Sequence, residues 1–284
     1  MTDNIMRTTA KPRGLLSAGG VLDRIVEAKA ARLEEAKRAT PLESLAGGAA
    51  RASNYVRRSF AEALARTDRI NVIAEIKRRS PSRGIIREDF DPVRIAKSYE
   101  SGGAAALSVL CEEDFFDGSL DHLKAARAAV ELPVLRKDFI FDEYQLVEAA
   151  AAGADAVLLI TAILDDELLG KLLTVSRQLR LDALVEVHSR DEMDRAVRAG
   201  AKIIGVNNRD LTTFEVDLNT SIELAAAAPS EVILVSESGI SRGSDIRRLK
   251  EAGFGAFLIG ERFMRADEPG RSLRELIAEA GKNE

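Results

Sequence analysis

The feature that most strongly constrains the fold of this chain is a repeated glycine at the predicted ends of helices, here called a glycine stop. Glycine stands between a helix-forming stretch and a short apolar run in Ser101-Gly-Gly-Ala104, Ala152-Gly-Ala-Asp155, Ala199-Gly-Ala-Lys202 and Ala252-Gly-Phe-Gly255. Glycine is common just past the end of a helix because it adopts the left-handed conformation without strain. The stops recur about every fifty residues, which leaves room for two strand–helix units per period. The sequence therefore predicts regular alternation of strands and helices.

The apolar runs that fit this repeat are candidate strands. They are Asn71–Ile76, Ala105–Leu110, Pro133–Leu135, Ala156–Ile160, Ala183–Val187, Lys202–Val206, Val232–Val235 and Ala256–Ile259. Runs that are apolar throughout are typical of parallel strands buried on both faces. Helix starts are indicated by Asp91-Pro92 and by possible capping boxes at Ser189–Glu192 and Thr220–Glu223.

Four periods of two units predict a closed (β/α)8 TIM barrel with extra N-terminal helices, since such barrels usually have about 250 residues. An open, doubly wound sheet is the alternative, although no Gly-x-Gly-x-x-Gly turn follows the first strand. We expect a flexible N-terminus at residues 1–20, a helical extension at 21–70 and the barrel at 71–284, as one domain overall. In the extension, helices are predicted over Val21–Arg38 and Arg57–Arg66, with a turn at Leu42–Gly48.

Composition excludes several classes of function. The net charge of −5 gives no basic face, so nucleic acid is not an expected partner. No apolar stretch is long enough for a signal peptide or a membrane span. The one cysteine, Cys111, rules out an internal disulfide and suits a reducing compartment. We therefore expect a cytoplasmic protein, with no membrane partner, that acts as a monomer.

Polar residues at the ends of the predicted strands indicate the site. Glu75 and Lys77 share one face of the first strand, about 6–7 Å apart, because side chains alternate along a strand. A structural ion pair at the strand end is the alternative reading of these two residues. The same alternation along other strands points four more side chains toward the inside of the barrel: Lys137, Glu186, Asn207 and Arg209. The carboxyl ends of barrel strands meet at one mouth, so these six side chains are expected to converge there.

Small residues after the last two strands indicate an anion site. Phosphate sites in such barrels commonly lie in the loops after strands seven and eight. Ser238-Gly239 and Gly260-Glu261 follow those strands, and their backbone N–H groups can approach an anion closely. His188 is expected to help start the next helix, and His122 to lie at the surface. No cluster with metal-ligand spacing is present in the sequence, so we predict no metal.

The stretch Ile73-Ala-Glu-Ile-Lys-Arg-Arg-Ser-Pro-Ser-Arg-Gly84 resembles the first-strand signature of the indole-3-glycerol phosphate synthase family. The resemblance extends in order from about Val21 to the end of the chain. It includes Cys111-Glu-Glu-Asp-Phe-Phe116-Asp-Gly118, Leu135-Arg-Lys-Asp-Phe139, Leu184-Val-Glu-Val187, Gly205-Val-Asn-Asn-Arg-Asp-Leu211 and Ser236-Glu-Ser-Gly-Ile240. It implies substrate contacts at Glu75, Lys77, Ser80, Lys137, Glu186, Asn207, Arg209 and Ser238. Glu261 stands where some members of the family have a small hydroxyl residue.

The resemblance implies a carbon–carbon lyase of tryptophan biosynthesis. Its substrate would be 1-(2-carboxyphenylamino)-1-deoxyribulose 5-phosphate, which undergoes ring closure, decarboxylation and dehydration without a cofactor. We expect Lys137 to act as the acid, with a pKa lowered by Lys77 and with Glu75 holding it in place. Glu186 is the expected base, two strands away from Lys137 and without direct contact to it. Which lysine acts in which step stays open.

Two alternatives remain at the level of the sequence. A phosphoribosylanthranilate isomerase shares the fold and the phosphate site. That family, however, looks to use a cysteine and an aspartate as its acid–base pair, with the cysteine on the first strand. Here the first strand offers Glu75 and Lys77 instead. A non-catalytic barrel that binds a phosphometabolite would need neither acid nor base, whereas both candidates are present.

Overall fold

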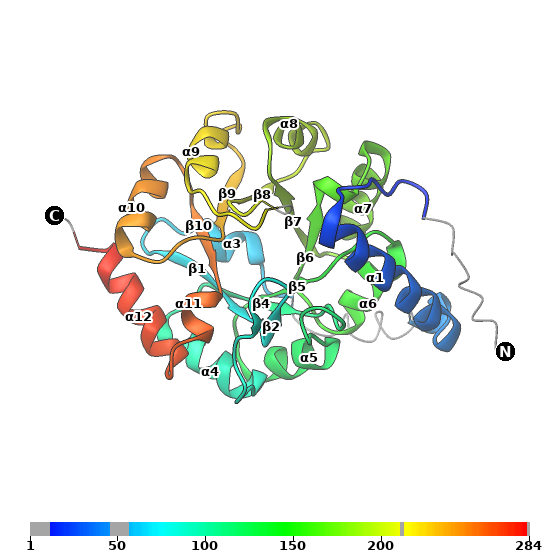
Figure 1. Cartoon of the computed structure of the whole chain (residues 1–284), viewed down its shortest axis with the longest axis horizontal. Coiled ribbons are helices and arrows are strands. Elements are labelled where there is room, and N and C mark those ends of the chain that lie inside the picture. Colours follow the sequence, from blue (N-terminus) through cyan, green and yellow to red (C-terminus); the bar gives the residue numbers. More distant parts are fainter. Residues whose placement is uncertain (1–11, 46–56, 211–212, 283–284) are drawn as a thin grey trace.

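The computed structural model of the chain describes residues 12–45, 57–210 and 213–282. Eight parallel strands close into a barrel in the order β1-β10-β9-β8-β7-β6-β5-β4. Their bounds are β1 Asn71–Ile76, β4 Ala106–Leu110, β5 Val134–Lys137, β6 Ala156–Ile160, β7 Asp182–Val187, β8 Ile203–Asn207, β9 Ile233–Glu237 and β10 Ala256–Ile259. Helices surround the strands (Figure 1). The TIM barrel predicted from the repeat is confirmed, and the open sheet is wrong.

The helices follow the expected order. Between the strands lie α4 Pro92–Gly102, α5 Leu120–Ala129, α6 Glu143–Ala151, α7 Asp166–Gln178, α8 Arg190–Arg198, α9 Asn219–Ala225 and α10 Gly243–Glu251, with α11 Glu261–Met264 and α12 Pro269–Ala280 after β10. A 3-10 turn, η1, spans Thr161–Ile163, and the loop after β1 forms a small hairpin of β2 Arg79–Ser80 and β3 Gly84–Ile85. None of the helices in these described segments is long and apolar enough to cross a membrane.

Helix ends test the local predictions. Gly103, Gly153, Gly200 and Gly253 all have positive φ after a helix, as the glycine stops predict. Asp91 caps α4 through the N–H groups of Val93 and Arg94.

The capping boxes are less regular than the sequence suggests. The Ser189 side chain accepts from the N–H of Glu192, but the Glu192 carboxylate accepts from His188 rather than from Ser189. The prediction of a capping box at Thr220–Glu223 is wrong. Asp217 accepts from the N–H of Asn219, so α9 begins at Asn219, one residue before Thr220.

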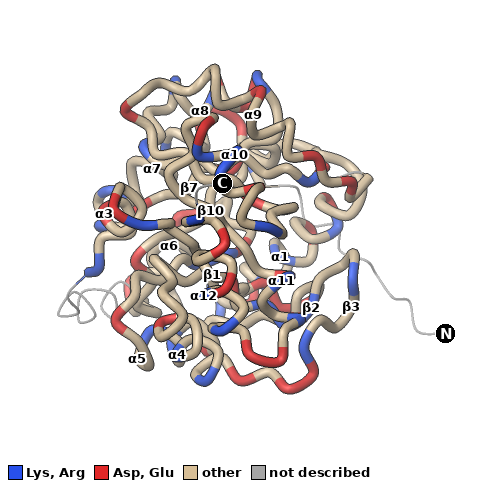
Figure 2. The backbone as a smooth tube through the Cα atoms, turned by 90° about the vertical axis from the view of Figure 1, so that its left-hand side faces the viewer, with Lys and Arg blue, Asp and Glu red and all other residues tan. Residues whose placement is uncertain are grey.

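The residues before the barrel cover both of its ends. Helix α1 (Gly20–Ala39) and helix α3 (Phe60–Leu64) match the two helices expected there, with α3 shorter than predicted. Figure 2 shows α3 on one side of the strands and α1 with the β2–β3 hairpin on the other. Of the turn expected at Leu42–Gly48, residues 42–45 are helical and 46–48 lie outside the described residues. The N-terminal residues 1–11, within the segment expected to be flexible, also lie outside them.

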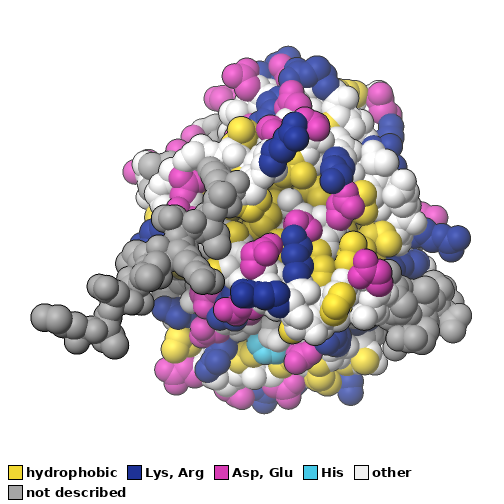
Figure 3. Space-filling model, turned by 90° about the vertical axis from the view of Figure 1, so that its right-hand side faces the viewer, with side chains coloured by type: hydrophobic (Ala, Val, Ile, Leu, Met, Phe, Trp, Pro, Cys, Tyr) yellow, Lys and Arg dark blue, Asp and Glu magenta, His cyan; other side chains and the backbone are white. Residues whose placement is uncertain are grey.

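The core consists of the strands and the inner faces of the helices. The strands β1, β4, β6, β8 and β10 are buried along their whole length. Lys, Arg, Asp and Glu side chains are interspersed over the face shown in Figure 3. Cys111 is buried, as expected for a small apolar residue. His122 is half-buried against Phe90, at 5.1 Å between ring centroids, so its expected surface position is only partly correct.

Candidate functional site

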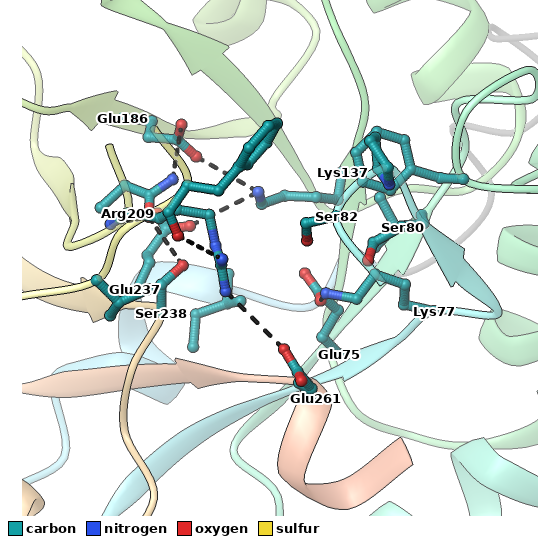
Figure 4. A pocket seen from close by; sticks show the side chains of 18 of the residues that line it. Glu75, Lys77, Ser80, Ser82, Lys137, Glu186, Arg209, Glu237, Ser238 and Glu261 are labelled. Carbon is teal, nitrogen blue, oxygen red and sulfur yellow. Dashed lines mark hydrogen bonds and ion pairs between the residues drawn. The ribbon is translucent and has the colours of Figure 1, made fainter. Parts of the chain in front are cut away.

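A cavity of about 460 Å3 opens at the carboxyl ends of the barrel strands. Every residue predicted for the site lines it: Glu75, Lys77, Ser80, Lys137, Glu186, Asn207, Arg209, Ser238, Gly239, Gly260 and Glu261. Helix α1 supplies part of the wall through Val21, Leu22 and Ile25. Figure 4 shows how the charged side chains of the strands turn toward this one space. The convergence expected from strand alternation is therefore present.

Lys137, the last residue of β5, extends across the barrel toward two carboxylates, those of Glu186 on β7 and Glu237 on β9. Its Nζ lies 3.4 Å from Glu186 Oε2 and 3.7 Å from Glu237 Oε2 (Figure 4). Burial alone would lower the pKa of Lys137, but Glu186, Glu237 and Glu75 outweigh burial and raise it above its ordinary value. The expectation that Lys77 lowers this pKa is wrong. The expectation that Lys137 and Glu186 make no direct contact is wrong as well.

Lys77 forms an ion pair with Glu75. Burial tends to raise the pKa of Glu75, but the charges of Lys77 and Lys137 lower it below the usual value. The structural ion pair considered for this strand is thus real. Both partners also line the cavity, so the pair is part of the site as well.

Glu186, on β7, accepts from three directions. Its Oε2 faces Lys137, while its Oε1 accepts from Asn207 Nδ2 at 3.3 Å and lies 3.3 Å from His188 Nε2. Burial opposes ionisation, but Lys137, His188 and Asn207 together hold the pKa of Glu186 well below its usual range. Glu186 is therefore ionised at neutral pH.

His188 takes part in both the helix start and the site. Its backbone N–H donates to Glu192 at 2.8 Å, in agreement with the predicted place before α8. Its ring lies between two carboxylates, with Nδ1 3.2 Å from Glu192 and Nε2 3.3 Å from Glu186. Burial would lower the pKa of His188, but the two carboxylates beside the ring, of Glu186 and Glu192, raise it to about 10. The imidazole is therefore a cation beside Glu186.

Glu237 is the site residue that sequence reasoning missed. It ends β9, is 1% exposed, and its Oε1 has no hydrogen-bond partner within the described segments. Burial and the charge of Glu186 raise the pKa of Glu237 to about 8, against the opposing effect of Lys137. Strand alternation could have found it, because Val235 and Glu237 share a face of β9. The next residue, Ser238, was predicted for the site instead.

The end of β8 and the loop after β9 form one polar cluster. Ser238 Oγ donates to Asn207 Oδ1 at 2.8 Å, and the N–H of Arg209 donates to the same oxygen at 3.1 Å. Ser238 and Gly239 both have positive φ, at 65° and 83°. Such a backbone turn is unusual for serine and fits a position where structure around it holds the chain.

Glu261 closes the cavity at the start of α11. Its carboxylate lies 3.3 Å from Arg83, 3.0 Å from Arg265 and 3.9 Å from Arg209. The Arg209 side chain extends toward it across the cavity (Figure 4). Gly260 packs against Glu75 so tightly that an added Cβ would stand 2.9 Å from Glu75 Cβ. An anion entering here would meet Arg83 and Arg209, and it would compete with Glu261 for them.

Ser80 and Ser82 stand on the β2–β3 hairpin at the rim of the cavity (Figure 4). Ser80 is 8% exposed, and it lies in β2. The described residues contain no group of three or more His, Cys, Asp or Glu side chains arranged to hold a metal ion. The chemistry that these side chains can supply is proton transfer and anion binding.

Comparisons with known proteins show the family to which this chain belongs. A sequence model described as indole-3-glycerol phosphate synthase matches residues 22–276. The indole-3-glycerol phosphate synthase of Polaromonas naphthalenivorans is 46% identical over 262 residues, covering 91% of this chain and 99% of that protein. The enzyme of the same name from Laribacter hongkongensis is 47% identical over 262 residues, with coverage of 91% and 99%.

Solved structures agree at the level of the fold. A 3-hexulose-6-phosphate synthase has a TM-score of 0.60 at 17% identity, covering 74% of this chain and 99% of its own. A thiamine phosphate pyrophosphorylase from Pyrococcus furiosus has a TM-score of 0.57 at 17% identity, with coverage of 75% and 98%. At this identity the two structures support the barrel and nothing finer. On the family match and on the identity to its relatives, this chain belongs to the indole-3-glycerol phosphate synthase family.

Proposed function

We propose that this protein converts 1-(2-carboxyphenylamino)-1-deoxyribulose 5-phosphate to indole-3-glycerol phosphate, CO2 and water. The relatives that cover most of the chain carry the name of this synthase. The observation that carries the proposal is the contact between Lys137 and Glu186 inside one cavity, which places a proton donor and a proton acceptor against the same substrate. The isomerase and the non-catalytic barrel are less well supported, because the family match names neither of them.

Ring closure needs a proton donor at the ketose oxygen, because the attacking aromatic carbon is a weak nucleophile. We assign this role to Lys137, which its carboxylate neighbours keep protonated at neutral pH. Its high pKa means that the proton moves late, as negative charge develops on the oxygen. Protonated Glu237 stands 3.7 Å behind the ammonium group and can supply a second proton to the same region. Loss of CO2 then leaves the ring system ready for dehydration.

Dehydration expels the hydroxyl group as water, with a proton that protonated Glu237 can supply, and it needs a base to remove the ring proton whose loss completes the aromatic indole. We assign this step to Glu186, whose lowered pKa keeps the carboxylate ionised. Asn207 donates to Glu186 and accepts from Ser238, so it orients the base and connects it to the loop after β9. Glu75 and Lys77 form the pair that would take over these roles if Lys137 or Glu186 proved dispensable.

The substrate carries a carboxylate and a phosphate, and two cations suit them. Lys77 and Arg209 both line the cavity, and both are engaged by acidic side chains, Glu75 and Glu261. We propose that the phosphate binds near Ser238-Gly239 and Gly260-Glu261, where Arg209 is close. A crystal soaked with inorganic phosphate tests this place. Density for the anion at the amino-terminal mouth of the barrel would contradict it.

The proposal includes action as a monomer in the cytoplasm, without a cofactor. Size-exclusion chromatography of the purified chain tests the first part. The decisive experiment for the function is a turnover assay with the carboxyphenylamino substrate, followed by the fluorescence of the indole ring. Formation of the indole product, lost in Lys137→Met, supports the synthase. Binding of the substrate without turnover would instead leave the non-catalytic barrel as the answer.

A further inference from the structure

Helix α1 carries a lysine that is buried beneath it. Lys29 is 4% exposed, and its Nζ lies 2.9 Å from Asp138 Oδ2 and 2.9 Å from Glu113 Oε2. Burial of a cation is unfavourable unless acidic partners compensate for it. Here burial would lower the pKa of Lys29, but Asp138 and Glu113 raise it against the opposing charge of Arg136. The lysine is therefore a fixed cation between α1 and two loops of the barrel mouth.

The two residues on either side of Lys137 are buried and paired with charged partners. Arg136 points to the opposite face of β5 from Lys137, because neighbours along a strand alternate, whereas Asp138 follows the strand and is among the residues that line the cavity. Asp138 Oδ2 accepts from Arg136 Nη2 at 2.7 Å, and its Oδ1 accepts from the N–H of Phe139 at 2.9 Å. Arg136 Nη2 also lies 2.8 Å from Glu148 on α6. The end of β5 is thus anchored through the flanking side chains while Lys137 points inward.

Lys29 completes this anchor from a helix that also forms the cavity wall. Ile25 lines the cavity and lies one turn before Lys29, so the two side chains share a face of α1. Asp138 forms ion pairs with Lys29 of α1 and with Arg136 of β5. Loss of Lys29 would remove a cationic partner from Glu113, and it would leave Asp138 to share Arg136 with Glu148.

We propose that Lys29 is a positioning residue for the reaction: by holding Asp138, it fixes the end of β5 so that Lys137 faces Glu186 and Glu237. The inference rests on the proposed role of Lys137. It gives the N-terminal helix a function in turnover as well as in enclosing the cavity. A displacement of about 1 Å at a reacting group can lower the rate about 10²-fold.

The test is Lys29→Met in the full chain, which removes the charge and keeps most of the volume. We expect kcat to fall roughly 10- to 100-fold while KM changes less than threefold. Arg32→Met is the matched control, because Arg32 lies on the same helix and pairs with Asp114 at 2.6 Å on the exposed side. This control should keep kcat within a factor of about two. Unchanged kcat in Lys29→Met overturns the proposal.

A loss of helix stability has to be separated from a loss of positioning. Leu33→Ala loosens α1 at a buried apolar residue and leaves the charge of Lys29 in place. If this variant lowers Tm as much as Lys29→Met and lowers kcat equally, the role of Lys29 is only structural and the proposal fails. Should Lys29→Met not fold, Lys29→Gln keeps a hydrogen-bond donor toward Asp138 and replaces it in the comparison.

A structural readout separates this inference from the proposed function. Crystal structures of the wild type and Lys29→Met should differ in the position of Lys137 Nζ relative to Glu186. A wild type that forms no indole product contradicts the synthase, whereas the crystal comparison still decides whether Lys29 positions Lys137. An unmoved Lys137 in the variant overturns the inference even if the synthase assay succeeds.

Discussion

The protonation states of the charged residues at the mouth of the barrel follow from their neighbours. Two lysines, Lys77 and Lys137, face three buried carboxylates, Glu75, Glu186 and Glu237. Lys77 compensates Glu75, and Lys137 with His188 compensates Glu186. Burial and the charge of Glu186 outweigh the effect of Lys137 on Glu237, so its pKa is the one of the three that rises, to about 8. The site therefore contains an ionised and a protonated carboxyl group beside the same ammonium group.

The first prediction concerns the acid and the base. Lys137→Met should lower kcat by about 10²–10⁴, which is the usual contribution of a general acid. Glu186→Gln keeps the size of the side chain and should also lower kcat, while the fold survives. The double variant should lose less than the product of the two losses if both residues serve one rate-limiting step. Lys124→Met, on the exposed face of α5, is the control. Near-normal turnover in either single variant would remove that residue from its role.

The second prediction concerns Glu237 and pH. Its folded pKa of about 8 lies above the ordinary value of 4.5, so between these values the unfolded chain releases a proton that the folded chain keeps. This group therefore makes the free energy of unfolding fall as pH rises from about 4.5 to 8, by at most roughly 1.4 kcal/mol per pH unit. Glu237→Gln cannot ionise, so its stability relative to the wild type should increase between pH 5 and pH 8. Urea denaturation at both pH values measures this, and a constant difference would contradict it.

The site could be predicted from sequence where it depends on strand alternation. Glu75, Lys137, Glu186 and Asn207 lie at strand ends, and their inward phase follows from counting residues along each strand. The ion pair of Glu75 with Lys77 was considered from the sequence because both lie on one strand. The contact between Lys137 and Glu186 could not be predicted, because these two residues come from different strands. Glu186 meets Lys137 across the intervening strand β6, which no spacing in the sequence indicates.

At the scale of elements, glycine sets how closely the strands and helices approach. The stops after helices were predicted because a positive φ leaves a local sequence signal. Gly205 and Gly260 have a different cause: a Cβ on either would collide with a site carboxylate, of Glu237 or of Glu75. That requirement comes from neighbouring strands, so the sequence around these glycines does not show it.

The third prediction tests this close packing. Gly260→Ala would place a Cβ 2.9 Å from Glu75 Cβ and 3.0 Å from Glu75 Cδ, so Glu75 and the end of β10 must shift. We expect a loss of about 1–3 kcal/mol in the free energy of unfolding, together with a lower kcat. Gly255→Ala is the matched control just before the same strand, because its nearest neighbour, the Leu64 carbonyl oxygen, is 3.8 Å away. Equal effects of the two substitutions would contradict the argument.

At the scale of the whole molecule, the segments before the barrel serve its two ends differently. Helix α1 lies at the carboxyl-terminal mouth, where Lys29 meets Asp138. The segment with α3 lies at the strand starts, where the N–H of Arg58 donates to Asp155 and the N–H of Ala61 donates to Asp182. The sequence predicted both helices from composition. It could not place α3, because the acceptors at the strand starts become neighbours only when the barrel closes.

The last prediction follows from this division. Deletion of residues 1–40 removes α1 with its cavity wall, its buried apolar side chains and Lys29, so the stability should fall while KM rises and kcat falls. Deletion of residues 1–66 also removes Phe60 and Leu64, which are 0% and 1% exposed. Each large apolar side chain lost from a core costs about 2–5 kcal/mol, and two such losses approach the stability of an average domain. Circular dichroism melting and turnover of both truncations measure these effects. A folded 67–284 chain with unchanged kinetics would show that neither helix matters to the site, and the role proposed for Lys29 would fall with it.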